Sequence, residues 1–225
     1  MKLSEYTINI LKNFSSINPS ILVKPGNVLS TVSVKSGGIF ASAIVEEEFP
    51  QQFAIYKLPE FLGIISLFKD PTFDFEKGRI KITEGKQRIY YTMADESAVV
   101  APPANKTIKL PSEDIAFDLS SEELQRLIKA ASILQLPSIA VKGDGQKTTL
   151  AAADAKNATA NEFSIDVGQT DKHFNMILNV ENIVKLIHNN YRVSISSKGI
   201  SRFVNKDGNS ITYYVANEAG SNFEG

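Results

Sequence analysis

The chain has 225 residues, 43% of them hydrophobic and 22% charged, with a formal net charge of −1. This composition predicts a folded protein of one or two domains. It excludes a helical membrane span, because no run approaches ~18 consecutive apolar residues. It also excludes a protein that coats nucleic acid through bulk basicity, although a local basic face is compatible with it. Without cysteine there is no disulfide framework or thiol nucleophile, and without an apolar signal core at the start we expect a cytoplasmic protein.

The first half of the sequence begins with a helix and continues mainly in strands. At helical spacing, residues 4–17 place Tyr6, Ile10 and Phe14 on one face, with Ser4 as N-cap. A second helix is expected where "LPEFLGII" begins at Leu58. Residues 79–83 ("RIKIT") alternate as a strand does, after a hairpin turn at Lys77-Gly78. The half ends with "IYYTMADE", residues 89–96.

The second half repeats these segments in the same order and at nearly the same spacing. The matching segments are "SEELQRLIKAASIL" (121–134), "PSIAVK" (137–142, over "PSILVK" at 19–24), "VENIVKLI" (180–187) and "ITYYVANE" (211–218). We expect Ser121 to be the N-cap of the third helix, without a capping-box Glu. We expect Val180, Ile183, Val184 and Ile187 to form the apolar face of the fourth. Shared strand and helix chemistry is the alternative explanation, but the common order favours a duplicated α+β unit with few helices and many strands.

A proline-rich stretch separates the two halves. "VVAPPANKTIKLPSED" contains Pro102, Pro103 and Pro111, which favour an extended path and interrupt sheet pairing. We therefore predict two domains, residues 1–107 and 108–225.

The sequence offers no constellation for catalysis. Its two histidines, His173 and His188, lie in different segments without a partner motif, and no phosphate-binding or nucleophile motif is present. Residues 46–48, three consecutive glutamates, are most simply a solvated edge. We therefore expect a protein that is not an enzyme and that uses neither a metal nor a cofactor.

The polar faces of the predicted helices carry basic residues. Lys12 lies opposite the apolar stripe of the first helix, Arg126 and Lys129 project from the third, and Lys185 projects from the fourth beside His188. Lys12 and Lys129 occupy equivalent positions in the repeat. Lysines are common on helix surfaces, so each residue alone is weak support, and the second helix has no outward base.

Several stretches resemble the DNA polymerase sliding clamps of T-even-type bacteriophages. The resemblance rests on "MKLSEYTINILKNFSSIN", "AIYKLPEFLGIISL", "VVAPPANKTIKLP" and "SSEELQRLIKAASILQL", and it weakens after about Ala151. It implies the DNA-clamp fold, with two similar domains per chain. It also implies a homotrimeric ring, with helices lining the hole and antiparallel sheets outside.

The resemblance also implies a function and a set of partners. Such a clamp encircles double-stranded DNA independently of sequence, tethers the replicative DNA polymerase and is loaded by an ATP-dependent clamp loader. Late-transcription factors are further candidate partners, no membrane is involved, and the location is the cytoplasm of an infected bacterial host. Glu5 and Glu122 depart from this pattern, because acidic side chains at the starts of helices one and three weaken a basic lining.

The resemblance implies three groups of site residues. The residues expected to face DNA are Lys2, Lys12, Arg126, Lys129, Lys185 and His188. The residues expected at the subunit interface are Ile89, Tyr91, Met93, Phe163 and Ile165, with residues 88–94 pairing against 161–167 of a neighbour, so that a proline at Tyr91 breaks the trimer. The residues expected to form a pocket for a partner peptide are Val99, Val100, Pro102 and Pro103, although Val99 and Val100 could instead simply anchor the linker.

Two rival interpretations remain open at this stage. One is a duplicated β-rich structural or binding module that oligomerises through sheet edges without DNA. The other is a duplicated carbohydrate- or lipid-binding module, against which the 9% aromatic content and the absence of tryptophan count modestly. A basic hole wide enough for duplex DNA distinguishes the clamp from the first, and a concave aromatic-lined pocket in each half would indicate the second.

Overall fold

The computed structural model describes residues 1–34, 38–103, 108–157, 159–208 and 210–224. The chain divides into two compact units, Met1–Lys106 and Thr107–Gly225. The predicted boundary at residue 107 falls in the stretch 104–107, outside the described residues. No helix in the described ranges is long and apolar enough to cross a membrane.

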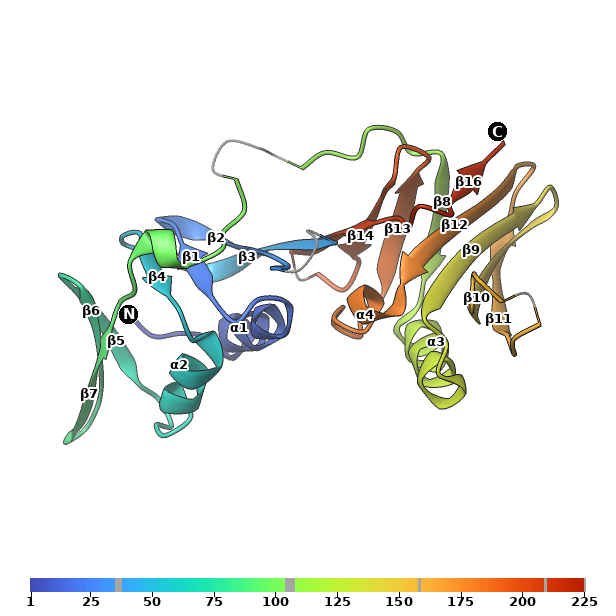
Figure 1. Cartoon of the computed structure of the whole chain (residues 1–225). Helices are drawn as coiled ribbons and strands as arrows, with labels where there is room; N and C mark the ends of the chain where they lie inside the picture. Colours follow the sequence, from blue (N-terminus) through green and yellow to red (C-terminus); the bar gives the residue numbers. More distant parts are fainter. Residues whose placement is uncertain (35–37, 104–107, 158, 209, 225) are drawn as a thin grey trace. The chain divides into compact units, whose positions relative to one another are not determined.

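The first unit is built from helices packed against short antiparallel sheets (Figure 1). Its elements are α1 (Glu5–Ile17), β1 (Ile21–Val23), β2 (Gly26–Val32), β3 (Ile39–Phe49), β4 (Phe53–Ile55), α2 (Leu58–Ile65), β5 (Thr72–Glu76), β6 (Arg79–Glu84), β7 (Gln87–Thr92) and a 3-10 turn, η1 (Glu96–Ala98). Strands β2 and β3 form a hairpin, β1 pairs with β4, and β5-β6-β7 form an antiparallel meander. Ile80 and Ile82 of β6 are both fully buried, as the strand pattern predicts.

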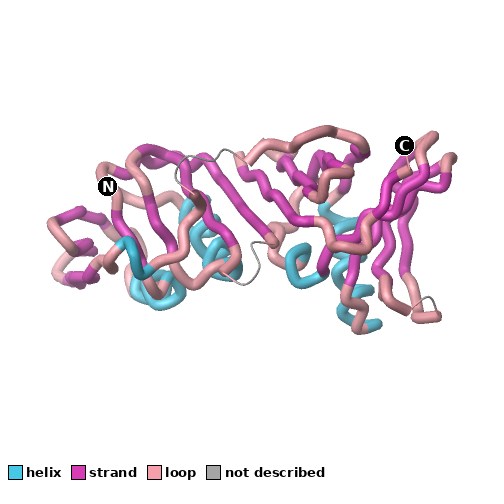
Figure 2. Tube along the Cα trace, turned by 45° about the horizontal axis from the view of Figure 1, so that its top comes forward, coloured by secondary structure: helices cyan, strands magenta, loops and turns pink. Residues whose placement is uncertain are grey.

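The second unit also combines few helices with many strands (Figure 2). Its elements are β8 (Ile115–Leu119), α3 (Ser121–Leu134), β9 (Ser138–Asp144), β10 (Lys147–Ala153), β11 (Phe163–Gln169), β12 (His173–Asn179), α4 (Val180–Ile183), β13 (Tyr191–Ser196), β14 (Ile200–Asn205), β15 (Ile211–Ala216) and β16 (Asn222–Phe223). One sheet has the order β11-β10-β9-β12-β16, and the strands β8-β13-β14-β15 pair antiparallel in the other. The predicted α+β class with antiparallel sheets is therefore confirmed.

Matching hydrogen bonds mark the repeat at the backbone level. The Leu58 N–H at the start of α2 donates to the Pro19 carbonyl (2.7 Å), and the Val180 N–H at the start of α4 donates to the Pro137 carbonyl (2.9 Å). In each unit the helix is followed by a three-stranded meander that ends in the repeated strand, β7 in one and β15 in the other.

The start of α3 differs from the prediction. Its N-cap is Ser120 rather than Ser121, and Glu123 occupies the third helical position in a complete capping box. The Ser120 Oγ accepts from the Glu123 N–H (3.2 Å), while the Glu123 carboxylate accepts from the Ser120 N–H (2.8 Å). The first helix is capped by Ser4 as predicted, with Thr7 at the third position.

The acidic run at residues 46–48 is more than a solvated edge. The Glu47 carboxylate on β3 accepts hydrogen bonds from the Ser4 N–H and the Thr7 hydroxyl, so it holds the first turn of α1. Burial opposes ionisation of this carboxyl, but those hydrogen bonds outweigh burial and lower its pKa. An acceptor at the N-terminus of α1 also suits the helix dipole.

Candidate nucleic-acid interface and sheet edges

The second unit gathers three of the predicted DNA-facing residues around one surface hollow. Arg126 and Lys129 on α3 and His188 on the segment after α4 all border a hollow of about 530 Å³. The remaining lining residues are Glu122, Gln125, Ile128, Ser132 and Ile133. Lys185 lies three positions before His188 and is partly exposed.

The fourth helix is shorter than the sequence pattern predicts. It ends at Ile183, so Lys185 and His188 lie on an irregular segment, residues 184–190, and Val184 is 45% exposed rather than part of the core. The helix stops because two buried tyrosines take up the backbone of Ile187. The Ile187 N–H donates to the Tyr213 hydroxyl (3.3 Å), and the Tyr191 hydroxyl donates to the Ile187 carbonyl (2.6 Å). Burial is the main reason that the pKa of Tyr191 is raised far above its usual value.

Further hydrogen bonds tie the segment 184–190 to the first turn of α3. The Ser121 N–H donates to the Asn190 side-chain carbonyl (2.9 Å), and the Ser121 hydroxyl donates to the His188 carbonyl (2.8 Å). Asn190 is itself fixed by Asp207, whose carboxylate accepts from the Asn190 N–H (2.8 Å) and Nδ2 (2.7 Å). The two elements that carry the basic groups, α3 and the segment 184–190, are therefore joined by hydrogen bonds.

The cations around this hollow differ in availability. Arg126 forms an i,i+4 ion pair with Glu122 (2.5 Å) in which both side chains are mostly exposed. Such a pair is worth ~0.3–0.5 kcal/mol, so a phosphate can displace the carboxylate at little cost. Lys129 is exposed, and its side chain has no ion-pair partner among the described residues.

The helices of the first unit carry fewer free cations. Lys12 is exposed on α1, but Lys2 forms an ion pair with Asp70. At the start of α2, Lys57 pairs with Glu60 (3.5 Å), and the helix itself has no basic residue.

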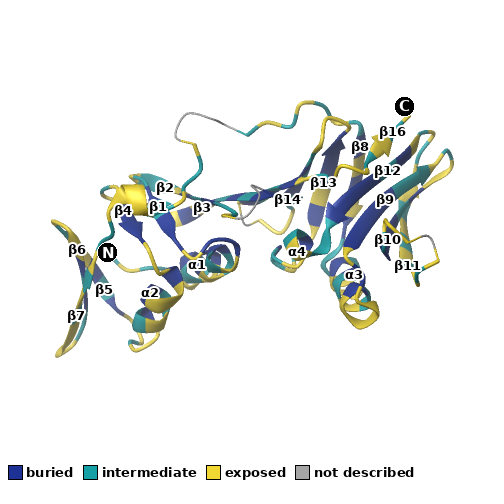
Figure 3. Cartoon of the chain, in the orientation of Figure 1, coloured by how far each residue is buried: buried dark blue, intermediate teal, exposed yellow. Residues whose placement is uncertain are grey.

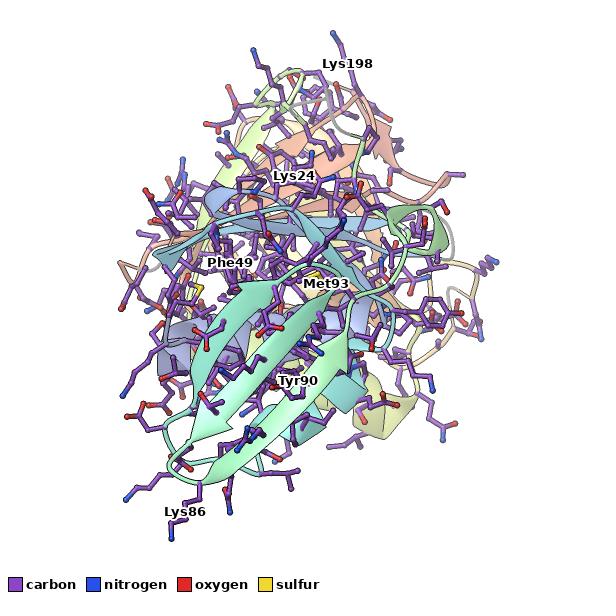
Figure 4. All side chains as sticks on the ribbon, turned by 90° about the vertical axis from the view of Figure 1, so that its left-hand side faces the viewer. Lys24, Phe49, Lys86, Tyr90, Met93 and Lys198 are labelled. Carbon is purple, nitrogen blue, oxygen red and sulfur yellow. The ribbon has the colours of Figure 1, made fainter. Side chains whose placement is uncertain are left out.

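The predicted interface strand β7 is an edge strand. It pairs with β6 alone in the described part of the sheet (Figure 4). The Met93 N–H donates back to the Gly78 carbonyl (3.0 Å). With a period of two, Ile89 and Tyr91 therefore use their backbone groups inside the sheet, while those of Arg88, Tyr90 and Thr92 point outward. A proline at Tyr91 would thus break the sheet itself, and Tyr90 is the position at which proline removes an outward N–H.

The second predicted interface strand, β11, is also an edge strand. It pairs with β10 and, in the described residues, with no other strand. Phe163 and Ile165 are half-buried, whereas Ser164 and Asp166, which alternate with them, are exposed. Both strands therefore have one partly apolar side and one polar side.

The predicted pocket residues of the connector serve partly as an anchor. Val99 and Pro102 are half-buried, while Val100 is 45% exposed and Pro103 is exposed. The fully buried Asn18 donates from Nδ2 to the carbonyls of Val32 (3.1 Å) and Val100 (2.9 Å). The backbone of Val100 is thus fixed to the core while its side chain points into solvent.

Comparison with known proteins identifies the family. The model described as "DNA polymerase processivity factor" matches residues 2–101, and the one described as "gp45 sliding clamp, C terminal" matches residues 116–219. The sliding clamp of Enterobacteria phage T4 is 34% identical, with 98% of each chain covered. That of Vibrio phage KVP40 is 34% identical, covering 97% of this chain and all of its own. The chain belongs to the phage sliding-clamp family.

The clamp also has the fold of solved clamps from cellular organisms. A PCNA of A. fulgidus, solved with the C-terminal region of FEN-1, superposes with a TM-score of 0.71 at 11% identity, covering 99% of this chain and all of that one. At such low identity the likeness shows the fold alone. Membership of the family makes this protein a DNA polymerase processivity clamp.

Sequence reasoning missed the residues that support the basic surface of this clamp. Ser121, Asn190, Asp207 and the two tyrosines hold the segment 184–190 without carrying any positive charge themselves. Their only sequence signal is a polar run, "HNNY", at residues 188–191 where a fourth helix was expected to continue. No group of acidic or histidine residues in the described ranges has the arrangement of a metal site.

Proposed function

We propose that this clamp closes into a homotrimeric ring around duplex DNA by pairing β7 of one copy with β11 of the next. The observation that carries the proposal is the match between these two edge strands. The half-buried side of β7, formed by Ile89, Tyr91 and Met93, can continue across the junction into that of β11, formed by Phe163 and Ile165. Because two different edges meet, the contact is heterologous, and repeating it generates a closed ring when the rotation between copies is one third of a turn.

The exposed sides of the two strands are complementary in charge. Lys86 lies in the turn of the β6–β7 hairpin (Figure 4). Arg88 lies on β7, Glu162 directly precedes β11 and Asp166 lies on β11. The acidic residues already pair with lysines of their own unit, Glu162 with Lys142 (2.5 Å) and Asp166 with Lys147 (3.0 Å). The complementarity therefore favours the correct register and partner more than it adds affinity.

Inside such a ring, the basic residues contact phosphates. The residues proposed for this role are Lys2, Lys12, Arg126, Lys129, Lys185 and His188. Phosphate contacts do not read sequence, so they permit sliding, and the closed ring retains the protein on DNA. The proposed role needs no catalytic group, and we propose a protein that is not an enzyme.

We further propose that partners dock at the connector, and that a clamp loader uses ATP to place the ring on DNA in the cytoplasm of an infected bacterium. The exposed side chain of Val100, with Val99, Pro102 and Pro103, offers apolar area on a backbone fixed by Asn18. Such area suits an apolar peptide from the DNA polymerase or from late-transcription factors.

Replacing Tyr90 with proline tests the ring. Proline removes an outward N–H of β7 while leaving the pairing with β6. We expect a shift in sedimentation equilibrium from a trimer of about 74 kDa toward the 24.7 kDa monomer. Tyr90→Ala is the control, and it should remain trimeric. It keeps the backbone N–H but removes the aromatic side chain, whose ring centroid lies 4.3 Å from the Arg79 guanidinium carbon. A Tyr90→Pro protein that is still trimeric would show that β7 is not the interface.

A further inference from the structure

The other edge of the β11 sheet is covered by the segment 217–224. This segment runs along β12 and bonds to it at successive positions. The Glu218 N–H donates to the Ile177 carbonyl (2.7 Å), the Ile177 N–H donates to the Ser221 hydroxyl (2.9 Å), and the Glu224 N–H donates to the His173 carbonyl (2.9 Å). Between them, β16 pairs with β12 at Asn175↔Asn222 and Phe174↔Phe223. The outward backbone groups of β12 are therefore occupied by this segment.

Side chains strengthen this cover. The Phe223 ring stacks on that of Phe174, with centroids 6.2 Å apart, and the Lys172 ammonium lies 5.6 Å from the Phe223 ring centroid. Phe174 is only 5% exposed beneath it. Because the segment belongs to the same chain, its effective concentration at the edge is high, so it outcompetes a separate molecule.

The β5 edge of the three-stranded sheet is covered at one of its two outward residues, Phe73, whereas the outward backbone groups of Phe75 have no backbone partner in the described residues. Phe73 exchanges two backbone hydrogen bonds with Met1, each 2.7 Å long. Pro71 lies two residues before Phe73 and faces the same outward side, and as a proline it has no N–H to donate. By contrast, the outward backbone groups of Arg88, Tyr90 and Thr92 on β7 have no backbone partner in the described part of the chain.

We infer that Met1 at Phe73 and the segment 217–224 along β12 are caps that shorten the edges that β5 and β12 offer, so that a second copy of this chain pairs preferentially with these two sheets at β7 and β11. An uncovered edge is a template for any other strand, and two β12 edges could pair with each other across a twofold axis. Such a contact joins rings to one another instead of closing them. This inference rests on the proposed ring. The caps would favour closure of the ring over pairing between rings.

Removing residues 220–225 tests the inference, because the deletion takes away β16 and leaves Asn217 and Glu218 bound. We expect the weight-average mass in sedimentation to rise with protein concentration to about twice that of the trimer, as uncapped β12 edges pair between rings. Phe223→Ala in the full chain is the matched control. It exposes Phe174 but keeps the backbone cover, so it should sediment as the parent does.

A second substitution distinguishes backbone pairing at the β12 edge from non-specific association. Asn175 shares the outward side of β12 with His173 and Ile177, so Asn175→Pro in the shortened chain removes an outward N–H and should restore the trimer. Should the shortened chain lose its circular dichroism signal, Asn222→Pro in the full chain detaches β16 without a deletion, and the same rise is expected. A folded uncapped protein that never exceeds the parent's mass overturns the inference, as does a Phe223→Ala protein that associates equally.

The test is independent of the ring interface. If Tyr90→Pro remains trimeric, the proposed junction at β7 is wrong, and removal of the cap still reports on β12. If Tyr90→Pro is monomeric while the uncapped chain gains no mass, the junction stands and the capping role is wrong.

Discussion

The strands β7 and β15 carry nearly the same sequence but lie in different environments. In "IYYTMA" and "ITYYVA", the residues Tyr91 and Tyr213 occupy matching positions. Tyr213 is fully buried, and its hydroxyl accepts a hydrogen bond from the Ile187 N–H. Tyr91 remains half-buried, with its ring 4.9 Å from that of Phe61. Figure 3 shows the difference in exposure between the β5–β7 meander and the largely buried β13.

Alternation in a sequence determines which side of a strand faces inward, but not how deeply that side is buried. Burial depends on what packs against that side: Tyr213 lies against Tyr191 and the segment 184–190. In β7 the outward backbone groups have no backbone partner among the described residues, and in the ring proposed above a second copy covers its half-buried side.

The largest effect is expected from truncating the two matched tyrosines. Tyr213→Ala removes a fully buried ring together with a partner of the segment 184–190, and we expect the free energy of unfolding to fall by about 3–5 kcal/mol. Tyr91→Ala should lower it by less than half as much in a monomeric background such as Tyr90→Pro, because its ring is only partly buried. Denaturant titration followed by circular dichroism measures both, and equal decreases would contradict the comparison.

The next effect concerns the basic surfaces. Replacing Lys129 and Lys185 with Glu should impair loading and processivity while leaving the trimer intact. The slope of log K against log salt should fall by about one for each phosphate that a chain no longer neutralises. Lys12→Glu in the first unit is the comparison and should lower the slope by about one per chain. Full processivity of the Lys129→Glu, Lys185→Glu protein would place the DNA elsewhere.

A smaller effect is expected at the helix caps. Ser120→Ala breaks the capping box of α3 and should cost about 1 kcal/mol. Ser4→Ala should cost less, because Glu47 still accepts from the residue 4 N–H and from the Thr7 hydroxyl. Denaturant titration of both variants checks the order; the reverse order would show that Glu47 does not support α1.

The smallest effect on stability is expected at the connector. Val100→Asp changes a side chain that is 45% exposed, so the free energy of unfolding should change by less than about 0.5 kcal/mol. Binding of a polymerase C-terminal peptide should nevertheless weaken, because a charge replaces apolar surface. Calorimetric titration with Val34→Asp as control, at a residue that is 51% exposed, tests this placement. Unchanged affinity at Val100 would remove the connector as the docking site.

The sequence by itself determined the α+β class, the order of the repeated segments, the inward positions of β6 and two of the buried residues of α1, Ile10 and Phe14. These features follow from local periodicity and turn chemistry, which are written in neighbouring residues. The lengths of the matched helices were not determined in this way. The fourth helix stops at Ile183 because Tyr191 and Tyr213, both later in the chain, bind the N–H and carbonyl of Ile187. Another helical turn would have used these backbone groups. Which edges stay open was likewise decided only by tertiary structure. The polar run after Ala216 hydrogen-bonds to β12, and Met1 hydrogen-bonds to Phe73 on β5. The backbone groups of an edge strand pair with whichever segment folds against them, and no local sequence pattern identifies that segment.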